Sequence, residues 1–273
     1  MPFDPYNRAS ELEAAAVNAM AARLESRGRD PFFIKMLDDY LADMDVEHLH
    51  LALDVGCGTG VAARRLANHP RFGGRAIGID RSSDLIEVAR RQAEAEGLSS
   101  KTEFRVGDAV ALGDLKGQFD AAIAHTLISH VDDPPAVLQE IAACVRPGGQ
   151  IAVFDGDYAS WVFAGENPDA GRKLADAVIR GIVTNPSIMR EFPRLLRKAD
   201  LQLVSTRAYV LSEIGRASFF ESSMSTYRVL LPLARHIDAA TVDQLVEIQR
   251  QNSANGSFFA AINFYTYLLR RPS

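Results

Sequence analysis

The chain has 273 residues, of which 47% are hydrophobic and 24% charged, as in a globular protein that buries a substantial core. Its net charge of -5 argues against a protein that holds nucleic acid electrostatically, and its two cysteines, Cys57 and Cys144, fit neither a disulfide framework nor a metal-binding spacing. The N-terminus lacks a signal-peptide pattern and no apolar run approaches the roughly 18 residues of a membrane helix, so we expect a soluble, cytoplasmic protein without a membrane span.

Helical periodicity dominates the first part of the chain. It covers residues 10–27 and 32–44, and Ser10 with Glu13 three positions later matches the capping box of a helix N-terminus. We expect residues 1–47 to form an N-terminal helical cap that packs over an edge of the sheet.

Between residues 48 and 157 the pattern alternates between strands and helices. Strands are predicted over residues 50–55, 75–80, 102–106, 119–124 and 150–155. The helices between them are predicted over residues 61–68, 83–96 (with Ser82 or Ser83 as its N-cap) and 134–145. This alternation predicts a parallel sheet with right-handed crossovers, and therefore an α/β core.

After residue 157 the alternation breaks. We expect a helical lid insertion without a strand over residues 158–185, and a helix and a strand of the core over residues 186–215. A second helical lid insertion is expected over residues 216–255, followed by a last core strand over residues 256–273. Insertions that leave a sheet and return to it are typical of lids over a binding site.

A glycine-rich turn follows the first predicted strand. The apolar run of this strand ends at Asp54, a helix begins at Val61, and between them lie three alternating glycines, Gly56, Gly58 and Gly60. Without side chains at these positions, the backbone can turn tightly and lie against a ligand. The turn also satisfies the dinucleotide-binding fingerprint, with Asp80 20 residues after Gly60, so a nicotinamide-dependent reductase remains open.

Two further carboxylates lie at predicted strand ends. Asp80 ends the second strand, where it could accept hydrogen bonds from both hydroxyls of a ribose or simply cap the next helix. Asp108 follows the third strand, where it could accept from the exocyclic amine of an adenine beside the N–H of Ala109. An ordinary Asx turn is the alternative for Asp108.

Taken together, these residues resemble the class I S-adenosylmethionine-dependent methyltransferases. Within them, the closest likeness is to the branch with the ubiquinone/menaquinone C-methyltransferases and many natural-product methyltransferases. The motifs that carry the resemblance span about residues 48–156 and are Leu53–Gly60, Gly78–Asp80, Gly107–Ala109, Phe119–Asp120 with residues 127–133, and Val145–Gly149. The resemblance implies a Rossmann-like α/β fold, with a seven-stranded, mostly parallel sheet, helices on both faces and a helical cap or lid.

The resemblance also implies roles for individual residues. Asp54 would lie near the methionine amino group of S-adenosylmethionine, and Asp80 would hold its ribose. His125 and Thr126 would face the sulfonium and the incoming substrate. The remaining cofactor-binding positions would be Gly56, Cys57, Gly58 and Gly60 along the methionine and ribose, and Arg81, Gly107, Asp108 and Ala109 around the adenine.

The reaction of this family is an in-line displacement, in which an O, N, C or S nucleophile attacks the methyl group and S-adenosylhomocysteine leaves. A base is needed only where the nucleophile must lose a proton. His125 and His130 are the candidate catalytic residues, because an unperturbed imidazole titrates near neutrality. His125 fits packing against the cofactor equally well, and His130 fits a structural role better.

Two motifs suggest other chemistry and are discounted. Residues 133–136 read Asp-Pro-Pro-Ala, similar to a motif of nucleic-acid amino-methyltransferases, but they lie too far after the fourth strand and lack the aromatic residue that stacks on a flipped base. Asp155 and Asp157 could suggest a metal. We expect no metal, because His125 rather than a carboxylate stands at the end of the fourth strand.

The acceptor is expected to be a small molecule, bound without nucleic acid, and the protein could be a homodimer. An apolar pocket for an aromatic or prenyl-like acceptor could include some of Trp161, Phe163, Phe219, Phe220, Tyr227, Phe258 and Phe264. A carboxylate could instead be recognised by Arg172, Arg190, Arg194 or Arg228. A cyclase or isomerase that binds the cofactor without methyl transfer, and a noncatalytic binding protein, are the remaining alternatives.

Overall fold

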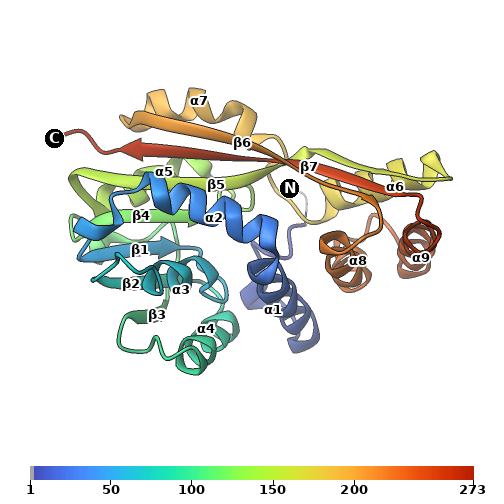
Figure 1. Cartoon of the computed structure of the whole chain (residues 1–273), viewed down its shortest axis with the longest axis horizontal. Helices are drawn as coiled ribbons and strands as arrows, with labels where there is room; N and C mark the ends of the chain where they lie inside the picture. Colours follow the sequence, from blue (N-terminus) through green and yellow to red (C-terminus); the bar gives the residue numbers. More distant parts are fainter. Residues whose placement is uncertain (1–2) are drawn as a thin grey trace.

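The computed structural model describes residues 3–273, which contain one seven-stranded sheet in the order β3-β2-β1-β4-β5-β7-β6 (Figure 1). β7 is antiparallel to both of its neighbours, and the other pairs are parallel. The predicted α/β fold with a mostly parallel sheet is therefore confirmed. The strands are β1 (Leu51–Val55), β2 (Arg75–Asp80), β3 (Thr102–Val106), β4 (Phe119–His125), β5 (Val145–Ala164), β6 (Gln202–Gly215) and β7 (Phe258–Arg270).

Helices cover both faces of the sheet. α2, α3 and α4 share one hydrophobic core with the sheet, and α5 and α7 share the other. None of the helices in residues 3–273 is long and apolar enough to cross a membrane. The α-helices are α1 (Ala14–Arg29), α2 (Pro31–Asp43), α3 (Val61–Ala67), α4 (Ser83–Ala95), α5 (Pro134–Cys144), α6 (Pro168–Gly181), α7 (Ile188–Ala199), α8 (Phe219–Leu230) and α9 (Ala239–Asn255). Short 3-10 helices are η1 (Ala9–Glu11), η2 (Val46–His48), η3 (Gly113–Leu115) and η4 (Leu231–Ala234).

The alternation of side chains along β1 determines which face of the sheet the carboxylate of Asp54 points to. Ala52 belongs to the core on the α2, α3 and α4 side, whereas Leu53 and Val55 belong to the core on the α5 and α7 side. Because residues two apart on a strand share a face, Asp54 points with Ala52 toward α3. A polar side chain is thus directed from the sheet toward the helix that follows the glycine turn.

The last three strands in the chain extend beyond the rest of the sheet. In Figure 1 they continue past the ends of the short strands β1–β4, and α6, α8 and α9 pack around this extension. The expectation of no strand over residues 158–185 is wrong, because β5 continues to Ala164 and pairs with β7 through Phe163 and Ala260. Trp161 and Phe163 are buried and Val162 between them is exposed, which is the alternation of a half-buried strand.

The N-terminal region packs between α4 and α8. α1 contacts both α4 and α8, and a small hydrophobic cluster joins Met20 of α1 to Leu85 and Leu230 (Figure 1). The predicted capping box at Ser10 is wrong, because α1 begins only at Ala14 and its N-cap residue makes no side-chain cap. The N-cap prediction for the fourth helix holds for Ser82, whose hydroxyl accepts from the N–H of Leu85. The division of the chain into cap, core and lid segments stays a prediction.

Candidate functional site

The carboxyl ends of β1, β2, β3 and β4 open into a cavity of about 360 Å³. Its walls also include α1 and residues of β5 and α8. Ligands of open α/β sheets bind at this edge, just outside the strand ends. Of the residues predicted for the site, the cavity brings together Asp54, Gly56, Cys57, Gly58, Asp80, Arg81, Gly107, Asp108, Ala109, His125, Thr126 and His130.

The glycine turn adopts backbone conformations that favour glycine. The φ angles are +66° at Gly56, +53° at Gly58 and +79° at Gly60. A Cβ atom at Gly56 would lie 2.5 Å from Leu127, and one at Gly60 would lie 2.5 Å from the ring of Phe104. Gly60 does not line the cavity; it stands before α3 as its N-cap, so the structure gives it a turning and packing role.

The carboxylate of Asp54 is buried in the cavity wall, and only one of its two oxygens has a hydrogen-bond partner among the described residues. Its Oδ2 accepts a hydrogen bond of 3.0 Å from the N–H of Ala63, while its Oδ1 is buried and has no partner among the described residues. Burial raises the pKa of Asp54 to about 7; the Ala63 N–H opposes this shift and the charge of Asp80 adds to it. A buried oxygen without a partner is costly, so this wall is suited to a ligand that brings a hydrogen-bond donor or a cation.

Asp80 is both part of the site and a support for the glycine turn. Its Oδ2 accepts from the N–H of Gly58 at 2.8 Å, and its Oδ1 accepts from the N–H of Ser82 at 2.9 Å. Burial raises the pKa of Asp80, although these N–H groups and Arg81 oppose the shift. Because each carboxylate oxygen has a second lone pair, Asp80 can still accept hydrogen bonds from a ligand in the cavity.

Asp108 and Arg81 form a small network with Asn7 at the cavity. Asp108 accepts from the N–H of Val110 at 3.2 Å, so the Asx turn considered for it is present, and its other oxygen lies 4.0 Å from Arg81. Arg81 also donates to the backbone oxygen of Asn7 at 2.6 Å. Asn7 in turn donates to Asp132 at 2.9 Å, so the N-terminal segment bridges two of the loops around the cavity.

His125 ends β4 with one ring nitrogen engaged and one available. Its Nδ1 lies 3.0 Å from the hydroxyl of Tyr40, and its ring stacks on Phe154 with the centroids 4.7 Å apart. Its Nε2 is buried without a partner in residues 3–273. Burial, with a smaller effect of Arg27, holds the pKa of His125 well below its usual value. The imidazole is therefore neutral at neutral pH.

Thr126 adopts a strained backbone conformation next to His125. Its φ of +56° is unusual for a β-branched residue, and such conformations cost about 1–3 kcal/mol. The conformation is held by two hydrogen bonds: the N–H of Thr126 donates to Phe154 at 2.6 Å, and Arg27 donates to the Thr126 hydroxyl at 2.8 Å. Strain of this kind gathers at functional sites, where the surrounding contacts can hold it.

His130 lies on the cavity but is tied to the N-terminal segment. Its Nδ1 lies 2.9 Å from Asp4, a buried carboxylate that also accepts from the N–H and the hydroxyl of Thr184. Burial alone would lower the pKa of His130, but Asp4 and then Asp155 outweigh it and the net pKa is raised. Asp4 thus joins three segments that are far apart in the sequence, which favours the structural role for His130.

Several cavity residues were missed by the sequence reasoning. The loop before α1 and the helix itself contribute Tyr6, Asn7, Arg23, Leu24 and Arg27. Arg23 and Arg27 are four residues apart, so they share one face of the helix. That spacing was the one available signal, and it does not say which face of α1 meets the cavity. Tyr158 was missed because its segment was expected to be helical.

Most of the residues proposed for acceptor binding lie outside the cavity. Of the seven aromatic residues, only Trp161 and Tyr227 line the cavity, and the others are buried in the large core. The four arginines considered for carboxylate recognition do not line it. Each is paired with a nearby acid: Arg172 with Asp169, Arg190 with Asp157, Arg194 with Glu191, and Arg228 with Asp243 and Glu247.

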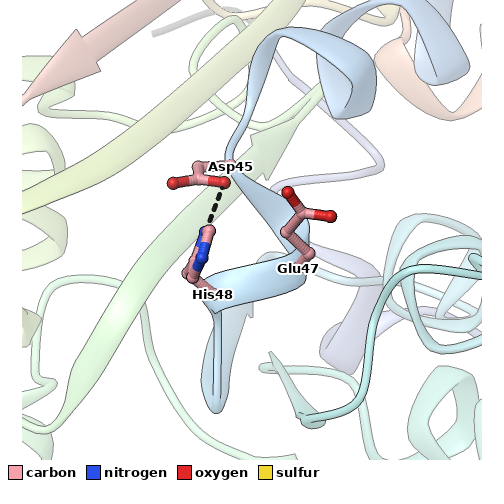
Figure 2. Close-up of side chains that lie close together, drawn as sticks. All are labelled: Asp45, Glu47 and His48. Atoms are coloured by element: carbon pink, nitrogen blue, oxygen red, sulfur yellow. Dashed lines mark hydrogen bonds and ion pairs between the residues drawn. The ribbon is translucent and has the colours of Figure 1, made fainter.

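The group of side chains most like a metal site lies away from the cavity. Asp45, Glu47 and His48 bring ligand-type atoms within 4.8 Å of one another, and Figure 2 shows them around η2. All three are exposed, and His48 pairs with Asp45 at 2.8 Å. This group precedes β1, whereas the cavity follows β1, so it lies at the opposite edge of the sheet. Asp155 and Asp157 are each engaged by protein groups, Ser129 and Arg190 respectively.

Much of the chain, including many cavity residues, is similar in sequence to known proteins. Residues 52–149 match the family described as "Methyltransferase domain". The chain is 31% identical over 219 residues to an uncharacterised 37.1 kDa protein in transposon TN4556 of Streptomyces fradiae, covering 78% of this chain and 60% of that protein. It is 32% identical over 175 residues to methyltransferase GfsG of Streptomyces halstedii, covering 62% of this chain and 59% of that one. The chain therefore spans about three fifths of the length of these two relatives.

A relative from quinone metabolism and a solved structure complete the comparison. The ubiquinone biosynthesis O-methyltransferase of Methylocella silvestris is 38% identical over 128 residues, which is 46% of this chain and 48% of that protein. The crystal structure of the [4+2]-cyclase SpnF matches with a TM-score of 0.64 at 17% identity, covering 100% of this chain and 98% of that one. At that identity the structural likeness shows a shared fold.

Proposed function

Because the chain belongs to the class I S-adenosylmethionine-dependent methyltransferases, we propose that it methylates a small metabolite with an aromatic or otherwise apolar body and leaves S-adenosylhomocysteine. The observation that carries this proposal is the convergence of Asp54, Asp80 and Asp108 on one cavity. The same cavity continues to Trp161 and Tyr227, so it offers room beyond the part that a cofactor would fill. The family match argues against the nicotinamide-dependent reductase.

The residues of the cavity fit the cofactor by their donor and acceptor character. The unpartnered Oδ1 of Asp54 suits the methionine ammonium, and the free lone pairs of Asp80 suit the ribose hydroxyls. The bare turn at Gly56 and Gly58 lets a ligand lie against the backbone. Asp108 with the N–H of Ala109 suits the adenine edge. The cofactor, when bound, supplies a methyl group on an already activated sulfonium.

The protein's own contribution to the reaction is mainly positioning and exclusion of water. Aligning the acceptor with the methyl group lowers the activation barrier, by about 7–11 kcal/mol where the reacting groups are well oriented. His125 lies at the end of β4, where its Nε2 has no partner among the residues that the structure describes. If its proton sits on Nδ1 and is donated to Tyr40, Nε2 presents a lone pair that can accept a proton from an acidic acceptor.

The direct test is a transfer assay with radiolabelled S-adenosylmethionine and a panel of phenols, quinols, amines and carboxylic acids. We expect label in a small organic product together with stoichiometric S-adenosylhomocysteine. The variant Asp80→Ala provides the matched control, since it keeps the acceptor side of the cavity and loses the ribose contacts. Label found only in protein or nucleic acid would contradict the proposal.

A second candidate is a reaction of the acceptor that uses the bound cofactor without methyl transfer. It is supported by the shared fold with a [4+2]-cyclase over the whole chain. The two candidates differ in one measurement. Product formation without S-adenosylhomocysteine favours the cyclase or isomerase, whereas equal amounts of both favour the methyltransferase.

A further inference from the structure

Two arginines of α1 face the cavity without an acidic partner among residues 3–273. Arg23 donates to the hydroxyl of Ser222 at 2.9 Å and lies over the ring of Phe219, with its Cζ 4.2 Å from the centroid. Arg27 donates to Thr126 and lies over the ring of Phe33 at 4.7 Å. Within residues 3–273, no carboxylate lies within 4.0 Å of either guanidinium. The other arginines considered for anion recognition are all paired with acids.

Arg23 is the more deeply buried of the two and keeps its charge. It is 8% exposed, and burial together with the charge of Arg27 lowers its pKa to about 10, which still leaves it cationic at neutral pH. A hydroxyl and an aromatic face compensate only part of the cost of burying a cation. A ligand that brings a negative charge into the cavity would supply the missing partner.

The wall beside Arg23 offers a second unpartnered donor. The indole Nε1–H of Trp161 is buried without a hydrogen-bond partner in the described part of the chain, and Trp161 lines the same cavity. Its ring lies 5.8 Å from that of Tyr158 and 5.9 Å from that of Tyr227. Both tyrosines lie close enough to Arg23 to influence its pKa. The guanidinium, the indole N–H and the aromatic rings thus form one region of the cavity.

This region is separate from the residues that fit the cofactor. Arg23 is held by α8 through Ser222 and Phe219, whereas Asp80 and Asp108 follow β2 and β3. Arg27 lies between the two parts, since it contacts Thr126 directly after His125. A carboxylate could reach these arginines from two sources, namely the methionine end of the cofactor and an acidic acceptor. The position of Arg23 against α8 favours the acceptor.

We propose that Arg23 and the Trp161 N–H form an anion-binding subsite for the methyl acceptor, which is then a small molecule with an aromatic or apolar body and a carboxylate or similar acidic group. The inference rests on the proposed function and adds the charge of its substrate. The aromatic rings would contact the body of the acceptor, and Arg23 would bind its acidic group by charge-assisted hydrogen bonds. Arg23 is therefore expected to determine specificity.

The test uses Trp161 as its own reporter, because it is the one tryptophan of the chain. The protein is saturated with S-adenosylhomocysteine and titrated with benzoate or octanoate, each paired with its neutral amide, while tryptophan fluorescence is followed. We expect each acid to bind at least about tenfold more tightly than its amide. Arg23→Gln should abolish this preference and Arg23→Lys should keep part of it. Arg172→Gln, which changes an exposed arginine outside the cavity, should leave it unchanged.

Calorimetry with S-adenosylhomocysteine separates the two sources of the carboxylate. We expect Arg23→Gln to bind S-adenosylhomocysteine within about twofold of the unchanged protein. An equal loss of affinity for S-adenosylhomocysteine would assign Arg23 to the cofactor and overturn the proposal, as would acids and amides that bind alike or not at all. If the unchanged protein binds no S-adenosylhomocysteine, the proposed function fails, and the same titration without it still decides whether the anion subsite exists.

Discussion

At the scale of single residues, Asp54 shows a conflict between folding and binding. A carboxylate that is buried with one unpartnered oxygen destabilises the folded protein when it is ionised, and the same oxygen is what a cationic ligand needs. Because burial raises the folded pKa to about 7, this cost grows as the pH rises from the unfolded value of about 3.9 and is complete above pH 7.

Asp54→Asn should therefore stabilise the free protein at pH 8 and weaken ligand binding. We expect a melting temperature about 2–4 °C higher, corresponding to about 1 kcal/mol, and an affinity for S-adenosylhomocysteine about 10- to 100-fold lower. In the unchanged protein the affinity should rise with pH through 7, since the ionised carboxylate attracts the ammonium, and this dependence should be flattened in the variant. A variant that loses stability at pH 8 would show that Asp54 is a structural carboxylate.

A second prediction at the scale of single residues concerns Asp80. Asp80→Ala should weaken S-adenosylhomocysteine binding by about 1–3 kcal/mol, because charge-assisted hydrogen bonds to the ribose are lost. The N–H of Gly58 also loses its acceptor, so part of the effect would come from the turn. Asp80→Asn keeps an acceptor for that N–H and should recover part of the affinity. An unchanged dissociation constant in a calorimetric titration would count against the ribose assignment.

At the scale of elements, the N-terminal segment connects the loop after β4 with the segment between α6 and α7. The carboxylate of Asp4 is nearly fully buried. It pairs with His130 in the loop after β4 and accepts a hydrogen bond from Thr184 in the segment between α6 and α7. Asn7 adds hydrogen bonds to Asp132 and Arg81. These contacts hold the segment against the mouth of the cavity.

Asp4→Asn should destabilise the protein by about 3 kcal/mol, because it leaves a buried imidazole without its charged partner. The raised folded pKa of His130 fixes the sign of the pH dependence. The stabilisation by this pair is fully present below the unfolded pKa of about 6.5 and is lost as the pH rises through the higher folded pKa. Denaturant unfolding at pH 6 and pH 9 should show a smaller loss on mutation at pH 9. Asp169→Asn, on the surface, is the matched control, and equal losses at both pH values would contradict the assignment.

At the scale of the whole molecule, the cavity connects the short strands of the core with the extension that carries α6, α8 and α9. The ends of β1–β4 supply one wall, and residues of β5 and α8 supply another. Residues of α1 complete the wall of the cavity. A ligand that contacts all of these elements should therefore stabilise the fold as a unit.

S-adenosylhomocysteine at 100 times its dissociation constant should stabilise the protein by about 2.7 kcal/mol, which corresponds to a rise in melting temperature of about 5–10 °C. Hydrogen exchange should slow in residues 3–30 as well as in the glycine turn. Protection confined to the core strands would mean that the N-terminal segment does not participate in binding. NADH serves as the control and should leave the melting temperature unchanged.

The sequence by itself determined the fold class and which strand-end residues gather at one edge of the cavity. Asp54, Asp80, Asp108 and His125 each lie at or just past the end of a predicted strand, and parallel strands bring such positions to one edge whatever else the chain does. The positive φ angles of the turn were predictable because glycine alone adopts them without strain.

Only the tertiary structure decided the rest of the site. Asp4 meets His130 across 126 residues and Thr184 across 180, and Arg23 meets Ser222 across 199, so no local pattern could indicate these contacts. The continuation of β5 to Ala164 was missed for a related reason, since a strand is stabilised by its neighbour and β7 lies about 100 residues further along the chain. Local backbone geometry thus fixed where the strand-end carboxylates gather, and long-range packing fixed which other side chains complete the cavity.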